Sequence, residues 1–125
     1  MALVLETAAR TALADSLGGL IDAGTTQAGG KLVIETSADA EISLHRFSNP
    51  FDTGAVAGVI TMDGAPKDDT SATAGTAAQF SIYDRNDVKI LEGVVAVTGA
   101  DLDLSSLAVG LGDTVSLTAF SLTVP

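Results

Sequence analysis

The only histidine, His45, is the residue of this sequence best suited to act as a catalytic base. It stands between Leu44 and Arg46 on a stretch that alternates like a strand. A histidine activates a serine or cysteine nucleophile when the two lie within hydrogen-bond reach. The chain has no cysteine and no G-x-S-x-G nucleophile elbow. We therefore expect His45 to be a solvent-facing strand residue, and we predict no catalytic residues and no enzymatic activity.

Two acidic stretches, "DLD" at 101–103 and "DRND" at 84–87, carry oxygen ligands that could suit calcium. Neither matches the calcium loop of an EF-hand, which needs an internal glycine and a closing glutamate. In a strand, Asp101 and Asp103 point to one face while Leu102 points to the other. A solvated acidic face explains this pattern, so we predict no metal site.

The glycine-rich "GLGDT", residues 110–114, resembles a phosphate-binding loop only superficially, because no P-loop lysine follows it. We interpret it as a tight turn before the last strand. A carbohydrate-cleaving site is also poorly supported, because such sites use aromatic platforms and the chain has one Tyr and no Trp. We predict no bound cofactor.

The composition describes one domain with an unusual core. The chain has 125 residues, 46% of them hydrophobic but only 4% aromatic. A core of Ala, Val and Leu gains less per residue than one built on large rings, which favours further stabilisation by oligomerisation. The formal charge of −10 repels nucleic acid and anionic membranes, so neither is an expected partner.

A helix is predicted over residues 6–22, with Thr7 as its N-cap and Gly24 in the left-handed position after its end. Apolar residues recur there at three- and four-residue steps and predict the buried stripe: Ala9, Leu13, Leu17, Leu20 and Ile21. Residues 24–30, "GTTQAGG", are expected to form a flexible connector.

The remaining sequence consists of short strand-like runs separated by turn residues, a pattern typical of an all-β domain. Strands are predicted at residues 31–36, 41–47, 56–62, 79–83, 88–97, 101–104 and 114–124. Residues 31–36 and 41–47 should form one hairpin, and 79–83 and 88–97 another. Residues 65–78 are predicted to be a surface loop. The expected fold is mainly β (α+β): an N-terminal segment and helix over 1–24, then an antiparallel β-sandwich of about seven strands over 31–125, of jelly-roll or Greek-key type, all in one domain.

The last predicted strand carries apolar residues on both faces. The alternation divides them into two sets: Val115 and Leu117 against Phe120, Leu122 and Val124. A bulge near Thr118 would bring all five into one core; without it, a second apolar layer must cover part of the strand. A neighbouring copy could supply that layer, as could the apolar segment formed by residues 3–5. The residues predicted to lie in an interface are Leu3, Val4, Leu5, Phe51, Phe120, Leu122 and Val124.

Three long stretches of the chain resemble small virion proteins of tailed bacteriophages. They are "MALVLETAARTALADSLGGLIDAG", "DTSATAGTAAQFSIYDRNDVKILEGVV" and "TGADLDLSSLAVGLGDTVSLTAFSLTVP". The similarity runs the length of the chain but includes no chemical motif. The amino-terminal stretch also lacks the basic region of a secretory signal, which agrees with synthesis in the host cytoplasm.

The resemblance implies a structural role rather than a reaction. Similar small acidic β-proteins decorate or cement capsids, binding the outer shell of the virion at three-fold positions, often as trimers. It therefore implies two partners, further copies of this chain and the major capsid protein. The alternative is a neck, tail or fibre component, or a carbohydrate-binding β-module displayed on the particle.

Overall fold

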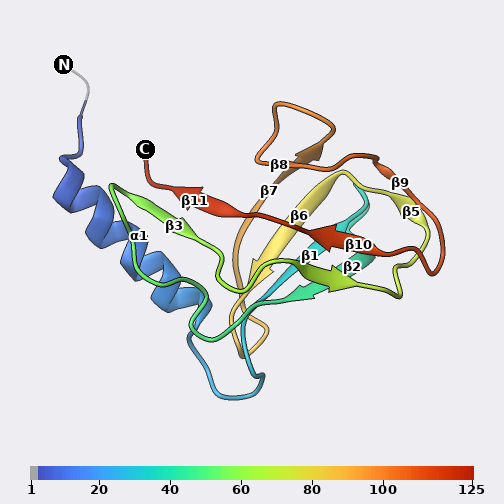
Figure 1. The fold of residues 1–125 in the computed structure, drawn as a ribbon, viewed down its shortest axis with the longest axis horizontal. Coiled ribbons are helices and arrows are strands. Elements are labelled where there is room, and N and C mark those ends of the chain that lie inside the picture. The colour runs from blue at the N-terminus through green and yellow to red at the C-terminus, as the bar shows by residue number, and fades with distance from the viewer. Residues whose placement is uncertain (1–2) are drawn as a thin grey trace.

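The computed structural model describes residues 3–125, which form one helix and eleven strands (Figure 1). The helix is α1 (Thr7–Ile21). The strands are β1 (Lys31–Glu35), β2 (Glu41–Arg46), β3 (Val59–Thr61), β4 (Lys67–Asp69), β5 (Gly75–Thr76), β6 (Gln79–Tyr83), β7 (Lys89–Ala96), β8 (Leu102–Asp103), β9 (Ala108–Val109), β10 (Val115–Leu117) and β11 (Ser121–Thr123). The mainly β fold with one N-terminal helix is as predicted.

A five-stranded sheet in the order β2-β1-β6-β7-β8 holds the longest strands. The two predicted hairpins, β1–β2 and β6–β7, are both antiparallel, but β8 adds to β7 in parallel, so the sheet is mixed. The other strands form the pairs β4–β10, β3–β11 and β5–β9. The predicted count of about seven strands is therefore too low, because short strands of polar and small residues escape a hydrophobic pattern.

One face of the five-stranded sheet carries most of the core. Leu32, Ile34, Phe80 and Ile82 are buried in β1 and β6. The β4–β10 pair lies in front of this sheet in Figure 1, and the β3–β11 pair lies between the sheet and α1. The ring of Phe120, just before β11, contacts Phe80 edge to face with 5.6 Å between centroids. This contact joins the C-terminal run of the chain to the centre of the sheet.

The C-terminal run is two strands rather than one. β10 pairs with β4 and β11 pairs with β3, and residues 118–120 separate them. This break changes the phase of the alternation, so all five apolar side chains of the run pack on the same core. This agrees with the predicted alternative of a bulge near Thr118, and the terminal strand needs no second apolar layer from residues 3–5 or from another copy.

Residues 65–78 are not simply a loop, because they contain β4 and β5. The β4 sequence, Lys-Asp-Asp, has no apolar alternation, and polar contacts hold it in place. The Asp69 carboxylate accepts a hydrogen bond from the Leu44 N–H of β2 at 2.9 Å, and the Ser116 hydroxyl of β10 donates to Asp68. β4 thus lies between two strands that are distant in the sequence.

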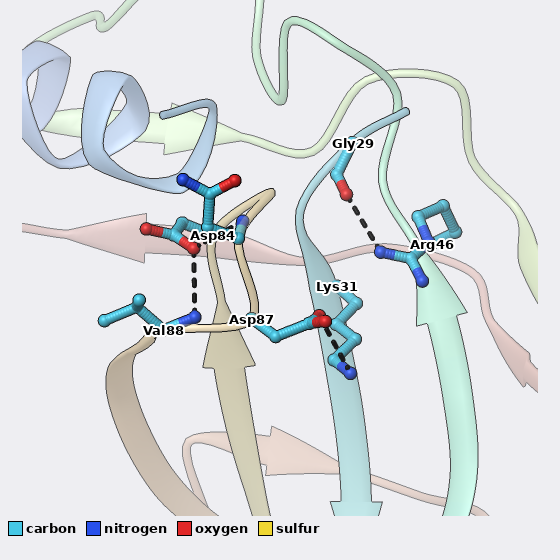
Figure 2. Close-up of polar contacts among 7 residues, drawn as sticks. Gly29, Lys31, Arg46, Asp84, Asp87 and Val88 are labelled. Atoms are coloured by element: carbon cyan, nitrogen blue, oxygen red, sulfur yellow. Dashed lines mark hydrogen bonds and ion pairs between the residues drawn. The ribbon is translucent and has the colours of Figure 1, made fainter. Parts of the chain in front are cut away.

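The connector at 24–30 is held in place by the β6–β7 turn. The Asn86 side-chain oxygen accepts hydrogen bonds from the Thr25 and Thr26 N–H groups at 3.1 and 3.2 Å. The Arg85 side chain donates to the Gln27 carbonyl at 2.8 Å. Figure 2 shows the neighbouring contacts of this corner: the ion pair between Lys31 and Asp87 and the hydrogen bond from Arg46 to Gly29. The expectation of a flexible connector does not agree with this network.

Candidate functional site

The residues predicted to form an interface fall into two groups. Phe51 and Phe120 are buried in the core of this chain, with 0% and 5% of their surface exposed, so their rings are not available to another protein. Leu122 and Val124 are half-buried against the same core. The segment Leu3-Val4-Leu5 is exposed. Of the predicted set, only this N-terminal segment presents large uncovered apolar side chains.

The helix has nearly the predicted bounds, but only part of the predicted stripe is buried: Ile21 is buried and Leu17 packs against the core, as predicted. Glu6, not Thr7, is the N-cap, and Gly24 has the expected positive φ of 108°. The buried helix residues are Ala14, Gly18 and Ile21. Of the predicted stripe, Leu13 and Leu20 are 49% and 53% exposed.

Polar side chains dock the helix and so determine which face is buried. Thr11, Asp15 and Asp22 accept hydrogen bonds from the backbone N–H groups of Gly58, Ala55 and Phe51, at 3.1, 2.8 and 2.8 Å. These three helix residues lie at steps of four and seven, on one side of the helix. Because backbone donors left unpaired there would be costly, this polar side lies against residues 51–58, and Leu13 and Leu20 face outward. Burial raises the pKa of Asp22, and the hydrogen bond from Phe51 partly offsets that effect.

The outward leucines and the N-terminal segment together form what we call the N-terminal apolar surface: Leu3, Val4, Leu5, Leu13 and Leu20. Leu13 and Leu20 lie two turns apart on the same side of α1. The sequence repeat predicts a buried stripe that includes these two leucines, but the hydrogen bonds of Thr11, Asp15 and Asp22 orient the helix so that they are exposed instead.

His45 is fully buried, so the prediction of a solvent-facing residue is wrong. Its Nδ1 lies 2.7 Å from the Lys67 carbonyl oxygen, which can only accept, so Nδ1 carries the proton. Its Nε2 accepts from the Ser43 hydroxyl at 2.9 Å. Burial lowers the pKa of His45, although the Lys67 carbonyl and Asp69 favour the charged form. Strand β4, which covers His45, was not predicted.

The Ser43–His45 pair has the separation of a nucleophile and its base. Ser43 is 1% exposed and His45 0%, so no substrate can reach either atom in this arrangement. The pair instead joins β2 to β4. For Asp69, next to it, burial raises the pKa, but hydrogen bonds from Leu44 and Ser71 outweigh that effect and the pKa is lowered. The geometry supports a structural role for this cluster.

The acidic stretches bind their own backbone. Asp84 accepts hydrogen bonds from the N–H groups of Asn86 and Val88, at 2.8 and 3.0 Å (Figure 2). Asp101 accepts from Val94 and Asp103 from Ala100, while Leu102 points into the core as predicted. Within residues 3–125, no group of three or more His, Cys, Asp or Glu side chains gathers as a metal site would require.

The "GLGDT" stretch forms the predicted turn before β10. The Asp113 carboxylate accepts a hydrogen bond from the Gly110 N–H at 2.7 Å, and Gly112 has a positive φ of 81°. A glycine tolerates this backbone conformation without strain. The aspartate therefore fixes the turn from within and does not form part of a phosphate site.

Comparison with known proteins identifies no relative. No family model, no curated protein and no solved structure matches this chain. Over the described residues, 3–125, no helix combines the length and the apolar character that crossing a bilayer requires.

Proposed function

We propose that this protein is a structural component of a tailed-bacteriophage virion, a decoration or cement protein that binds the outer capsid surface and stabilises contacts between capsomers. The N-terminal apolar surface carries this proposal. Among the described residues, 3–125, it leaves five large apolar side chains between 42% and 101% exposed. Exposed apolar surface of this kind is typical of a protein that buries it against another protein.

The size of this surface suits repeated, individually weak contacts. Complete burial of an exposed Leu or Val side chain contributes about 1.5–3 kcal/mol. Leu3 and Val4 are almost fully exposed and Leu5, Leu13 and Leu20 about half, so their burial contributes roughly 5–10 kcal/mol. Association itself costs about 4–15 kcal/mol. One copy would therefore bind weakly, and copies linked in an oligomer would bind much more tightly by acting together.

The proposed assembly is a homo-oligomer, a trimer by the resemblance, bound to the major capsid protein. The net charge of −10 keeps many closely spaced copies soluble. A protein that binds only the expanded shell stabilises that shell through linkage. We propose no catalytic activity, because the one Ser–His pair is buried beneath β4. We propose that the five-stranded sheet and the three strand pairs together represent a β-sandwich of jelly-roll or Greek-key type.

The decisive experiment compares virions with and without this protein. Particles that lack it should release their DNA at a lower temperature and on a milder osmotic shock, and adding back the purified protein should restore resistance. If both kinds of particle open equally readily, the cement role is wrong. A copy number comparable to that of the capsid subunits indicates the shell, whereas a small fixed number indicates the neck, tail or fibre.

A surface variant links this role to the structure. Leu13→Gln combined with Leu20→Gln should abolish binding to stripped particles and shift the purified protein toward the monomer in sedimentation. Leu111→Gln is the matched control, because Leu111 is 82% exposed and lies in the turn between β9 and β10, far from α1 (Figure 1). Equal loss of binding in both variants would contradict the assignment of the surface.

A further inference from the structure

A second surface of the molecule is a groove that follows the C-terminal run. A hollow of 480 Å³ lies between residues 103–109 and residues 113–118. Hollows of 300 and 310 Å³ continue it past Phe120 toward β7 and share Phe120 and Ser121 with each other. We call this continuous feature the C-terminal groove. Its first hollow is lined by residues of β9 and β10, two strands that lie on the side of the sheet away from α1 (Figure 1).

The strands that border the C-terminal groove each have an unpaired edge. β10 pairs only with β4, and β11 only with β3. Across the groove, β8 pairs only with β7, and residues 91–93 of β7 pair only with β6. An unpaired edge presents free N–H and C=O groups that another extended segment can join. At about 3.3 Å per residue, a segment of roughly six to eight residues would cover most of the run from Val115 to Thr123.

Apolar side chains line the interior of the groove at intervals. Val115 and Leu104 lie in the first hollow, and Phe120, Phe80 and Leu91 in the last. Phe80 and Phe120 are buried, so the apolar surface open to another segment comes from the half-buried Leu91, Leu104 and Val115. Alternate residues of an added strand would therefore face apolar surface, while the residues between them would face outward.

The rim of the groove is acidic and lacks cations. Asp101, Asp103 and Asp113 line it. One oxygen of each accepts a backbone hydrogen bond, from Val94, Ala100 and Gly110 respectively, which fixes the carboxylate in place. Within residues 3–125, the ion pairs are Lys31–Asp87 and Lys89–Glu92, so none of the three aspartates has a cation within 4.0 Å. The rim complements a positively charged partner.

A second copy of this chain is a poor occupant. It carries the same charge of −10. Each of its cationic side chains already contacts its own chain: Arg10 with Thr7, Lys31 with Asp87, Arg46 with Gly29, Lys67 with Ser48, Arg85 with Gln27 and Lys89 with Glu92. An extended segment of this acidic chain would place like charges against the rim, which is unfavourable.

We propose that the C-terminal groove binds an extended segment of a different protein, in which lysine or arginine alternates with apolar residues, by adding it as a β-strand. The backbone edges hold the segment, the apolar side chains fill the interior, and the cations pair with the three aspartates. This surface is separate from the N-terminal apolar surface, and the proposal holds whether or not the protein belongs to a virion.

The test uses a fluorescein-labelled seven-residue peptide of alternating lysine and valine, blocked at both ends, and the full chain. Fluorescence anisotropy should show saturable binding, and amide chemical shifts should change at Gly93, Ser116 and Ser121. A peptide of equal composition with its valines grouped together should bind at least about tenfold more weakly. Equal binding of the two peptides, or shift changes outside the groove, would show only general attraction to an acidic protein and would overturn the proposal.

Substitutions of the rim aspartates provide a second test of the proposal. Asp103→Asn with Asp113→Asn removes two charges but keeps a side-chain oxygen for each backbone hydrogen bond, so the fold should persist. Peptide affinity should fall by roughly three- to tenfold. The matched control is Asp63→Asn, an exposed acid outside the groove lining, which should leave affinity unchanged. If the wild type instead self-associates with shift changes at the groove, a second copy is the occupant and the proposal is wrong.

Discussion

Replacing Phe120 with alanine distinguishes a core residue from an interface residue. Phe120 is 5% exposed within a single chain and contacts Phe80 edge to face. Truncating a buried Phe to Ala costs about 3–5 kcal/mol, from lost apolar burial and the cavity left behind. The edge-to-face pair accounts for about 0.5–1.5 kcal/mol of this. We therefore expect Phe120→Ala to lower the free energy of unfolding by about 4 kcal/mol.

Leu13→Ala is the matched comparison, because Leu13 is 49% exposed. For the monomer its cost should stay below about 1 kcal/mol. Urea unfolding followed by circular dichroism, at two protein concentrations a hundredfold apart, measures both variants. The Phe120→Ala effect should be the same at both concentrations, because the cover comes from the same chain.

Two outcomes would refute this reasoning. One is a cost for Phe120→Ala below about 1 kcal/mol. The other is a cost that grows with protein concentration, because a residue covered by another copy is coupled to association. Since the stability of small domains is about 5–15 kcal/mol, the alanine variant risks complete unfolding. Phe120→Leu, which leaves a smaller cavity and so costs less than the alanine variant, then provides the measurement, and its cost should likewise be the same at both protein concentrations.

Three further predictions concern the buried histidine, the helix glycines and the β6–β7 turn. Burial lowers the pKa of His45 in the folded chain below the ordinary value of 6.5, so as the pH falls the unfolded chain takes up the proton first. The free energy of unfolding should therefore decrease below about pH 6.5, by up to ~1.4 kcal/mol per pH unit, until the folded pKa is reached. Urea unfolding across this range measures the effect, and His45→Gln should remove it. Gly19→Ala should raise the melting temperature, since its Cβ meets nothing within 4 Å and alanine favours the helix by about 1 kcal/mol. Gly18→Ala should gain less or lose stability, since its Cβ would lie 2.6 Å from an Asp52 oxygen. Asn86→Ala removes the acceptor of two exposed backbone N–H groups of the connector, which water can then bind, so it should cost about 0.5–1.5 kcal/mol and speed hydrogen exchange at residues 24–30.

The hairpins could be predicted because their signals are local. β1, β2, β6 and β7 match predicted strands closely, since each alternates and adjoins a turn that pairs it with its neighbour. The helix was located for the same reason, by its repeat and its flanking glycine. The residues of these elements interact mainly with others close in the sequence, so the local pattern of apolar and turn residues is enough to predict them.

The buried face of the helix depends on distant residues and so could not be predicted. The sequence predicts that Asp15 faces only water, but in the structure its carboxylate accepts a hydrogen bond from the Ala55 N–H. Asp69 of β4 likewise acts through Leu44, 25 residues earlier. The burial of His45 follows from that same strand. In each case a polar residue that should face water in isolation supplies a hydrogen bond to backbone that folding would otherwise leave without one.

Salt should affect the two proposed surfaces in opposite directions, which follows from their charges. Association through the N-terminal apolar surface brings together chains of charge −10, so salt that screens their repulsion should strengthen it. Binding of a lysine-rich strand to the rim of Asp101, Asp103 and Asp113 gains from attraction, so the same salt should weaken it. Sedimentation of the protein alone and anisotropy with the peptide, each at low and at moderate ionic strength, measure the two trends. If both weaken as salt rises, self-association is electrostatic, and the apolar side chains of α1 and residues 3–5 do not drive it.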